Sequence, residues 1–126
     1  CRKSGYVNNI FGRRSHFISI NDKNYNVRNF QERAAINAPI QGSASEIMRL
    51  AMIRLDEKLK EKKNQNTKML LQIHDELIFE APEEDMKRIS KMITEEMSSV
   101  ANSEHHSFSI PLTIDLNAGY NWGDLH

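Results

Sequence analysis

Three consecutive polar residues, His74, Asp75 and Glu76, interrupt an apolar stretch that reads KMLLQIHDELIFEA over residues 68–81. The flanking runs, MLLQI and LIFEA, predict a β-hairpin with the polar residues at its tip. Such a turn would hold carboxylates in a small volume on a rigid support. Mg²⁺ prefers oxygen ligands, but one or two carboxylates form only part of its shell, which substrate phosphates and water complete. An ordinary exposed hairpin tip is also polar, so the tripeptide alone does not distinguish a metal site from a plain turn.

Two helices are expected to support this hairpin. Residues 29–62 carry apolar side chains at spacings of three or four, which predicts an amphipathic helix whose inward face is formed by Ile40, Ala44, Ile47, Ala51, Leu55 and Leu59. Pro39 and Gly42 predict a kink or break in its first part, because proline lacks a backbone donor and disfavours the helical conformation of the preceding residue. Residues 83–101 predict a second amphipathic helix with acidic residues in its first turn.

Extended segments complete the expected architecture. Residues 6–20 carry aromatic and β-branched residues on both sides of Gly12, which predicts extended structure around a turn, and residues 21–29 predict a polar loop. A last strand is expected near residues 111–117. The predicted fold class is α+β, with an antiparallel sheet that contains the hairpin and the last strand and packs against the two helices.

The composition predicts one globular domain over residues 1–126. Of the 126 residues 39% are hydrophobic, and no apolar run reaches the roughly 18 residues of a membrane span, so no membrane partner is expected. The single cysteine, Cys1, allows no internal disulfide and favours a reducing compartment. The opening residues lack the features of a signal or transit peptide, and we expect a piece of a longer chain.

The charges are unevenly distributed although the formal net charge is zero. Residues 1–33 hold seven Lys or Arg, including Arg13 and Arg14, against two acidic residues. This excess of positive charge is suited to phosphate contacts. An ordinary solvated face is the alternative interpretation.

Two longer stretches carry a resemblance. ERAAINAPIQGSASEIMRLAM, at residues 32–52, and MLLQIHDELIFE, at residues 69–80, closely resemble two successive stretches of family A DNA polymerases of the bacterial DNA polymerase I type. The opening GYVNNIFGRR and the closing PLTIDLNAGYNW resemble the same family, in the same order. The resemblance therefore covers essentially the whole chain, which would be the C-terminal part of the polymerase palm domain.

The resemblance implies roles for the hairpin tip in DNA-directed DNA synthesis during replication or repair. In this family the turn is a polymerase motif, so Asp75 would be a ligand of catalytic Mg²⁺ and Glu76 would support the metal site or the primer end. His74 would lie beside the primer terminus. Nucleotidyl transfer in the complete enzyme would use two Mg²⁺ ions roughly 3.5–4 Å apart. The implied partners are primer-template DNA, deoxynucleoside triphosphates and the rest of the polymerase chain.

A polar helix face is implied as well. Arg33, Asn37 and Gln41 follow one another at intervals of four residues, on one side of the expected helix. Long polar donors in this arrangement could reach the minor-groove acceptors that every base pair presents in nearly equivalent positions. A solvated face is again the alternative.

The second metal-binding carboxylate of the family lies in a motif of the DYSQIELR type, and no such string occurs in this chain. The fingers helix that binds the incoming nucleotide is also absent. We therefore expect no DNA synthesis by this chain alone and expect self-association through surfaces that the rest of the polymerase would cover. In the closing segment, Trp122 is expected to be a packing anchor.

Two other functions agree with some of these features. A non-catalytic DNA-binding module would keep only the helix face, and a phage-type single-subunit RNA polymerase would share the palm. The Glu after His-Asp and the ERAAINAPIQG helix favour the DNA enzyme. The expected location is the bacterial cytoplasm or an organelle.

Overall fold

The structure is a computed structural model that describes residues 1–103 and 106–125. It divides into two compact units, Cys1–Arg49 and Leu50–His126, and one long helix, α1 (Tyr25–Leu59), contributes residues to both. In the described part of the chain, no helix combines the length and apolarity needed to cross a bilayer.

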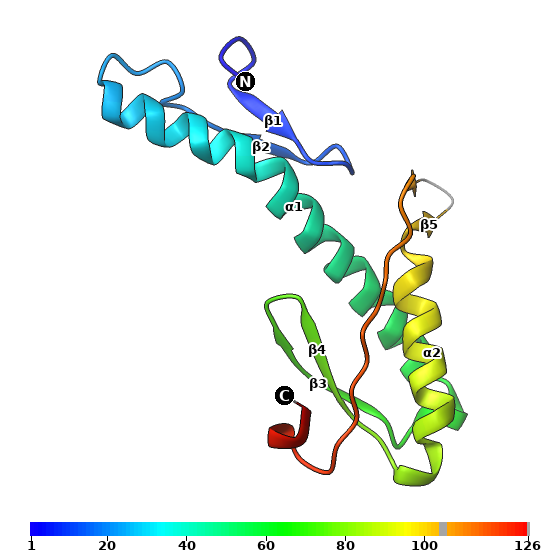
Figure 1. Cartoon of the computed structure of the whole chain (residues 1–126). Helices are drawn as coiled ribbons and strands as arrows, with labels where there is room; N and C mark the ends of the chain where they lie inside the picture. Colours follow the sequence, from blue (N-terminus) through cyan, green and yellow to red (C-terminus); the bar gives the residue numbers. More distant parts are fainter. Residues whose placement is uncertain (104–105, 126) are drawn as a thin grey trace. The chain divides into compact units, whose positions relative to one another are not determined.

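The first unit begins with two short antiparallel strands, β1 (Tyr6–Asn8) and β2 (Arg14–His16) (Figure 1). The loop between them includes Gly12, whose φ of 81° is readily adopted only by glycine. The predicted extended structure around Gly12 is therefore confirmed.

The helix α1 begins at Tyr25, four residues before the predicted start. The preceding segment supplies a cap, since the Oδ1 atom of Asn24 accepts a hydrogen bond from the backbone N–H of Asn26 at 3.0 Å. The carbonyl of Asn24 accepts the first helical bond, from Arg28. Asn24 is thus a typical N-cap residue, and part of the polar segment expected to be a loop is helical.

Of the kink or break expected at Pro39 and Gly42, the break is wrong, because α1 continues through both residues to Leu59. Proline removes one backbone donor from the helix but leaves the turns on either side intact. The contacts of this part of α1 with the β1–β2 loop, described below, offset that loss.

The second unit contains the predicted hairpin and second helix. The short helix η1 (Lys62–Asn64) leads into β3 (Lys68–Ile73) and β4 (Glu76–Glu80), which pair antiparallel with an irregularity between Met69 and Leu71. The chain continues through η2 (Glu83–Asp85) and α2 (Met86–Ser99) to the two-residue strands β5 (Asn102–Ser103) and β6 (His106–Ser107), and it ends in η3 (Trp122–Leu125). The α+β class is confirmed.

The core of this unit lies between the end of α1, the hairpin and α2. Leu55 of α1, fully buried, packs with Ile89 and Ile93 of α2. Leu77 and Phe79 of β4 pack against this cluster. The core therefore holds the hairpin through β4, the strand that follows the turn.

Part of the predicted inward face of α1 is exposed. Ala51 and Leu55 are buried, as expected, but Ile40 and Ala44 are exposed. A sequence period identifies an apolar side of a helix but not how much of its length another element covers.

The strand predicted near residues 111–117 is wrong. In the described residues the hairpin sheet has two strands, β3 and β4, and residues 111–117 belong to no strand. Half-buried Leu112 and Ile114 alternate with exposed neighbours, as in extended chain. A strand also needs a hydrogen-bonded neighbour, and Pro111 lacks a donor for one.

Candidate functional site

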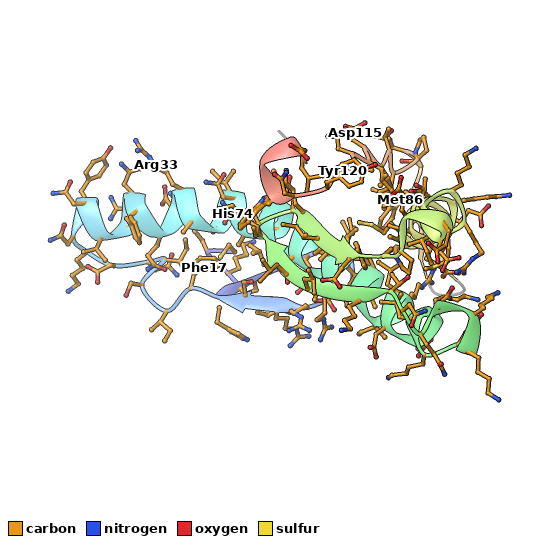
Figure 2. The ribbon with its side chains drawn as sticks, turned by 90° about the horizontal axis from the view of Figure 1, so that it is seen from below. Phe17, Arg33, His74, Met86, Asp115 and Tyr120 are labelled. Carbon is orange, nitrogen blue, oxygen red and sulfur yellow. The ribbon has the colours of Figure 1, made fainter. Side chains whose placement is uncertain are left out.

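The hairpin turn consists of two residues, His74 and Asp75, because Ile73 pairs directly with Glu76. His74 has a φ of 53°, in the region that favours glycine, so the backbone is strained at this point. Its carbonyl accepts a hydrogen bond from the Nε2 atom of Gln72 at 3.4 Å. The His74 side chain lies at the hairpin end in Figure 2.

The two carboxylates of the turn are open to solvent. Asp75 is the second loop residue and Glu76 is the first residue of β4, and both are exposed. Their oxygens suit Mg²⁺ chemically, but within the described residues no group of three His, Cys, Asp or Glu side chains could hold a metal ion. In the described part of the chain, the turn therefore supplies two carboxylates that belong to no larger group of metal-binding side chains.

The three polar residues predicted on one helix side do lie on one side of α1. Arg33, Asn37 and Gln41 are all exposed, and the Arg33 side chain projects away from the helix in Figure 2. None of the three side chains has a hydrogen bond or ion pair with another described residue. Their donors are therefore available to a ligand.

Large apolar side chains lie beside these polar residues. Phe30, Ile36 and Ile40 are 71%, 70% and 72% exposed. Exposed apolar area of this kind marks a surface suited to contact with another molecule or segment.

The two arginines predicted to bind nucleic acid are exposed but have partners. The Nε atom of Arg13 lies 3.0 Å from the Oε2 atom of Glu46 on α1. The guanidinium of Arg14 lies over the ring of Tyr6, 4.4 Å from its centroid. Both contacts limit the directions in which these side chains can point.

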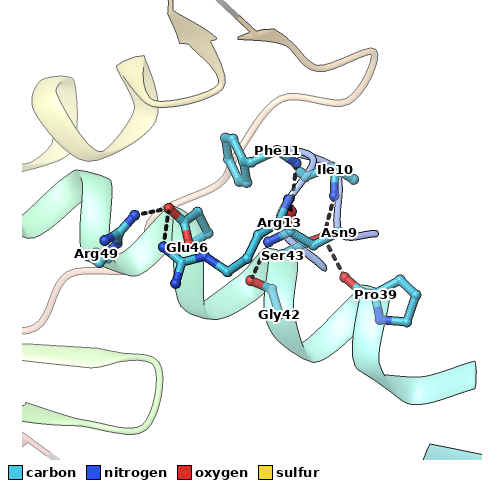
Figure 3. A network of polar contacts seen from close by, with 9 residues as sticks. All are labelled: Asn9, Ile10, Phe11, Arg13, Pro39, Gly42, Ser43, Glu46 and Arg49. Atoms are coloured by element: carbon cyan, nitrogen blue, oxygen red, sulfur yellow. Dashed lines mark hydrogen bonds and ion pairs between the residues drawn. The ribbon is translucent and has the colours of Figure 1, made fainter. Parts of the chain in front are cut away.

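A polar network that the sequence did not predict holds the β1–β2 loop (Figure 3). The Oδ1 atom of Asn9 accepts hydrogen bonds from the backbone N–H groups of Phe11 and Arg13, both at 2.9 Å. An asparagine three residues before a glycine is a recognisable turn signal. However, the Nδ2 atom of Asn9 also donates to the carbonyl of Gly42 at 3.2 Å, and no local pattern indicates this contact.

Ser43 forms the second connection of the network. Its Oγ atom accepts a hydrogen bond from the backbone N–H of Ile10 at 3.1 Å and donates to the carbonyl of Pro39 at 2.5 Å. Glu46, one turn further along α1, pairs with Arg49 as well as with Arg13. The loop is therefore attached to α1 over residues 39–46.

Charged side chains at the C-terminal end of α1 shift one another's pKa values. A hydrogen bond from Lys63, supported by Lys58, lowers the pKa of the exposed Glu61 carboxyl. Hydrogen bonding and charge from Glu61 raise the pKa of Lys58, and Asp56 does the same for Lys60. These groups form a solvent-exposed charge cluster.

The closing segment is anchored by polar contacts rather than by its tryptophan. Trp122 is 52% exposed, so its expected role as a packing anchor is wrong. The hydroxyl of Tyr120 instead donates to the Oε1 atom of Glu83 at 3.1 Å. Asp124 accepts from the backbone N–H of Tyr120 and from the side-chain amide of Asn121.

Comparison with known proteins gives consistent matches over nearly the whole chain. The profile of DNA polymerase family A matches residues 1–124. DNA polymerase I of Bacillus caldotenax is 42% identical over 123 residues, which are 98% of this chain and 13% of that protein. DNA polymerase I of Streptococcus pneumoniae serotype 4 is 44% identical over 121 residues, 96% of this chain and 13% of that protein.

A solved structure has the same fold. The POL domain of Pol1 from M. smegmatis, in a complex with DNA primer-template and dNTP, matches with a TM-score of 0.89 and 35% sequence identity. The match covers 98% of this chain and 21% of that one. The chain thus spans about an eighth of the length of the curated relatives, with 13% covered.

Proposed function

The chain belongs to DNA polymerase family A, and we propose that it is the part of a DNA-directed DNA polymerase that carries one metal-binding carboxylate and a primer-template contact face. The observation that carries this proposal is the exposed His74-Asp75-Glu76 turn on a packed hairpin. A rigid support with open carboxylates is what a metal-assisted transfer of a nucleotide requires.

Asp75 would hold Mg²⁺ together with a carboxylate from another part of the polymerase, and Glu76 would support that site or the primer end. When bound, Mg²⁺ would supply Lewis-acid stabilisation of charge on the reacting phosphate oxygens. The strained backbone at His74 fixes where the turn presents these groups. The His74 side chain, exposed at the first turn position, would lie beside the primer terminus.

The exposed side of α1 would contact the duplex. Arg33, Asn37 and Gln41 have no competing side-chain partners among the described residues, and their donors suit the degenerate acceptors of the minor groove. Arg13 and Arg14 would contact backbone phosphates, which are recognised without regard to sequence. The partners would be primer-template DNA and deoxynucleoside triphosphates, the ligands that the M. smegmatis complex contains.

The chain would need the rest of the polymerase for activity. With Asp75 as the metal-binding carboxylate proposed here, the oxygens needed to fix two Mg²⁺ ions are incomplete. The chain would act in the bacterial cytoplasm or in an organelle, as part of a palm domain to which we assign residues 1–126.

Primer extension with a labelled primer-template tests this function. The intact polymerase that contains this chain should extend the primer with the nucleotide that the template specifies, whereas the isolated chain should give no product at any Mg²⁺ or Mn²⁺ concentration. Extension by the isolated chain that disappears with Asp75→Ala would contradict the incomplete metal site. An intact protein that binds DNA but never extends it would instead be a binding module.

The helix face has its own test. In the intact polymerase, Arg33→Ala and Gln41→Ala should weaken primer-template binding by about 5- to 150-fold if each removes a good base-edge contact, with little dependence on sequence. Unchanged affinity in both variants would remove this face from the DNA interface.

A further inference from the structure

The β1–β2 loop contacts α1 over residues 39–46 (Figure 3), and helix geometry places these contacts on the side away from the proposed DNA face. A helix turns by about 100° per residue, so Gly42 lies about 140° from Asn37 and Ser43 about 200° from Gln41 around the axis. Burial agrees with this geometry, since Ser43 is 8% exposed whereas Asn37 and Gln41 are exposed. The loop therefore supports the back of the helix.

The attachment is made by buried polar atoms. Asn9, 9% exposed, uses both ends of its amide, with Oδ1 bound inside the loop and Nδ2 bound to the Gly42 carbonyl. The Ser43 hydroxyl is likewise both acceptor and donor, from Ile10 and to Pro39. Rotating or sliding α1 against the loop would break these hydrogen bonds. Such a movement costs free energy, because buried polar groups would be left unpaired.

The contacts also lie at the weakest point of the helix. Pro39 removes one backbone hydrogen bond, and such positions are where helices bend. Asn37 precedes Pro39 and Gln41 follows it, so a bend here would change the direction of one side chain relative to the other. The Ser43 hydroxyl bound to the Pro39 carbonyl, and Asn9 bound to Gly42, secure this turn.

We propose that Asn9 and Ser43 are positioning residues for primer-template binding, because they fix the rotation of the part of α1 that presents Arg33, Asn37 and Gln41. This inference rests on the proposed DNA contact of that helix face. Neither residue needs to touch DNA. Their effect on affinity passes through the direction of the exposed side chains on the other side of α1.

The test uses the intact polymerase that contains this chain, with Asn9→Ala, Ser43→Ala, Ser43→Thr, Gln41→Ala and the Asn9→Ala/Gln41→Ala double variant. The dissociation constant for labelled primer-template is measured by fluorescence anisotropy, the maximal incorporation rate on saturating DNA by rapid quench, and stability by thermal melting. Ser43→Thr is the matched control, because it keeps the hydroxyl that bonds Ile10 and Pro39.

Asn9→Ala and Ser43→Ala should each weaken DNA binding by about 3- to 30-fold, as expected for coupled neighbours, with a much smaller change in the maximal rate. Ser43→Thr should restore the affinity. The double variant should bind more tightly than the product of the two single losses predicts, because a displaced helix already loses the Gln41 contact. If Asn9→Ala does not fold, the Ser43→Ala and Ser43→Thr pair gives the same comparison.

Three results would overturn the inference. The first is unchanged DNA affinity in Asn9→Ala and Ser43→Ala, whether or not the melting temperature falls. These residues would then have a structural role only, and weaker binding by Gln41→Ala would still support the proposed function. Losses that multiply in the double variant would mean that Asn9 acts independently of the helix face. Unchanged affinity in Gln41→Ala and Arg33→Ala would refute the helix-face proposal, and the inference with it.

Discussion

His74 occupies the hairpin position at which the backbone is least suited to a side chain. Its φ of 53° is the one positive value at a non-glycine residue in the described part of the chain. Holding a non-glycine residue there costs of order 1 kcal/mol, which packing of the surrounding structure must offset. Leu77 and Phe79 of β4, packed on the core cluster, supply that packing.

Replacing His74 by glycine relieves the backbone strain, which should raise the free energy of unfolding by about 0.5–1 kcal/mol. The greater conformational freedom of glycine in the unfolded chain opposes this gain and at most cancels it. His74→Val should lower the free energy of unfolding, because a β-branched residue is still less suited to positive φ. Urea denaturation of the two variants measures the difference. Greater stability of the valine variant would contradict the strained backbone at the turn.

The sequence predicts some features of the candidate site and misses others for a physical reason. The turn at His74 and Asp75 is predictable because two apolar, β-rich runs flank a few polar residues, and this pattern lies within one short stretch of sequence. The Asn9 contact with Gly42 joins residues 33 positions apart, so it depends on how the chain packs. Composition around Asn9 indicates a turn but not its partner.

Among the secondary-structure elements, α1 departs most from expectation. Its early start follows from the Asn24 cap. Asparagine favours turns as well as helix N-caps, so the Asn-rich segment alone does not distinguish a loop from the start of a helix. Its continuity through Pro39 is not predictable from propensity alone, because contacts with the β1–β2 loop outweigh the local preference for a break. Residues 111–117 form no strand for a related reason. A strand requires a neighbouring strand as its hydrogen-bonding partner, and the sequence of the segment does not show whether one is present.

The C-terminal half of α1 is the part that the core depends on. Leu55→Ala removes a fully buried side chain between α1 and α2 and should lower the free energy of unfolding by about 2–5 kcal/mol. Ile53→Ala on the same helix is the control, because Ile53 is 50% exposed and its loss should cost far less. Chemical denaturation of both variants makes the comparison. Equal losses would contradict the packing of α1 described here.

At the scale of the whole molecule, the chain exposes many large apolar side chains for its size. Examples are Ile18, Phe30, Ile36, Ile40 and Ile110, which are 99%, 71%, 70%, 72% and 74% exposed. Exposed apolar surface of this kind is suited to contact with another molecule or another chain segment. The family resemblance was visible in the sequence, whereas the extent of this exposed surface required the structure.

The isolated chain should consequently self-associate as its concentration rises. Light scattering should show an average mass above 14.6 kDa at high concentration. Ile36→Gln and Ile40→Gln together should reduce the association, while Lys91→Gln, on the exposed side of α2, should not. A clean monomer over the whole concentration range would contradict the prediction.

We propose that Asp75 holds metal at the reacting phosphate of a DNA polymerase. The most direct measurement is single-turnover nucleotide incorporation by the intact polymerase with Asp75→Ala, with the DNA dissociation constant measured in parallel. Asp75→Ala should lower the incorporation rate by orders of magnitude and leave DNA affinity nearly unchanged. Glu80→Ala, at the other end of the hairpin, should have a normal rate and affinity. Loss of DNA binding by Asp75→Ala with normal turnover on bound primer would contradict the proposal.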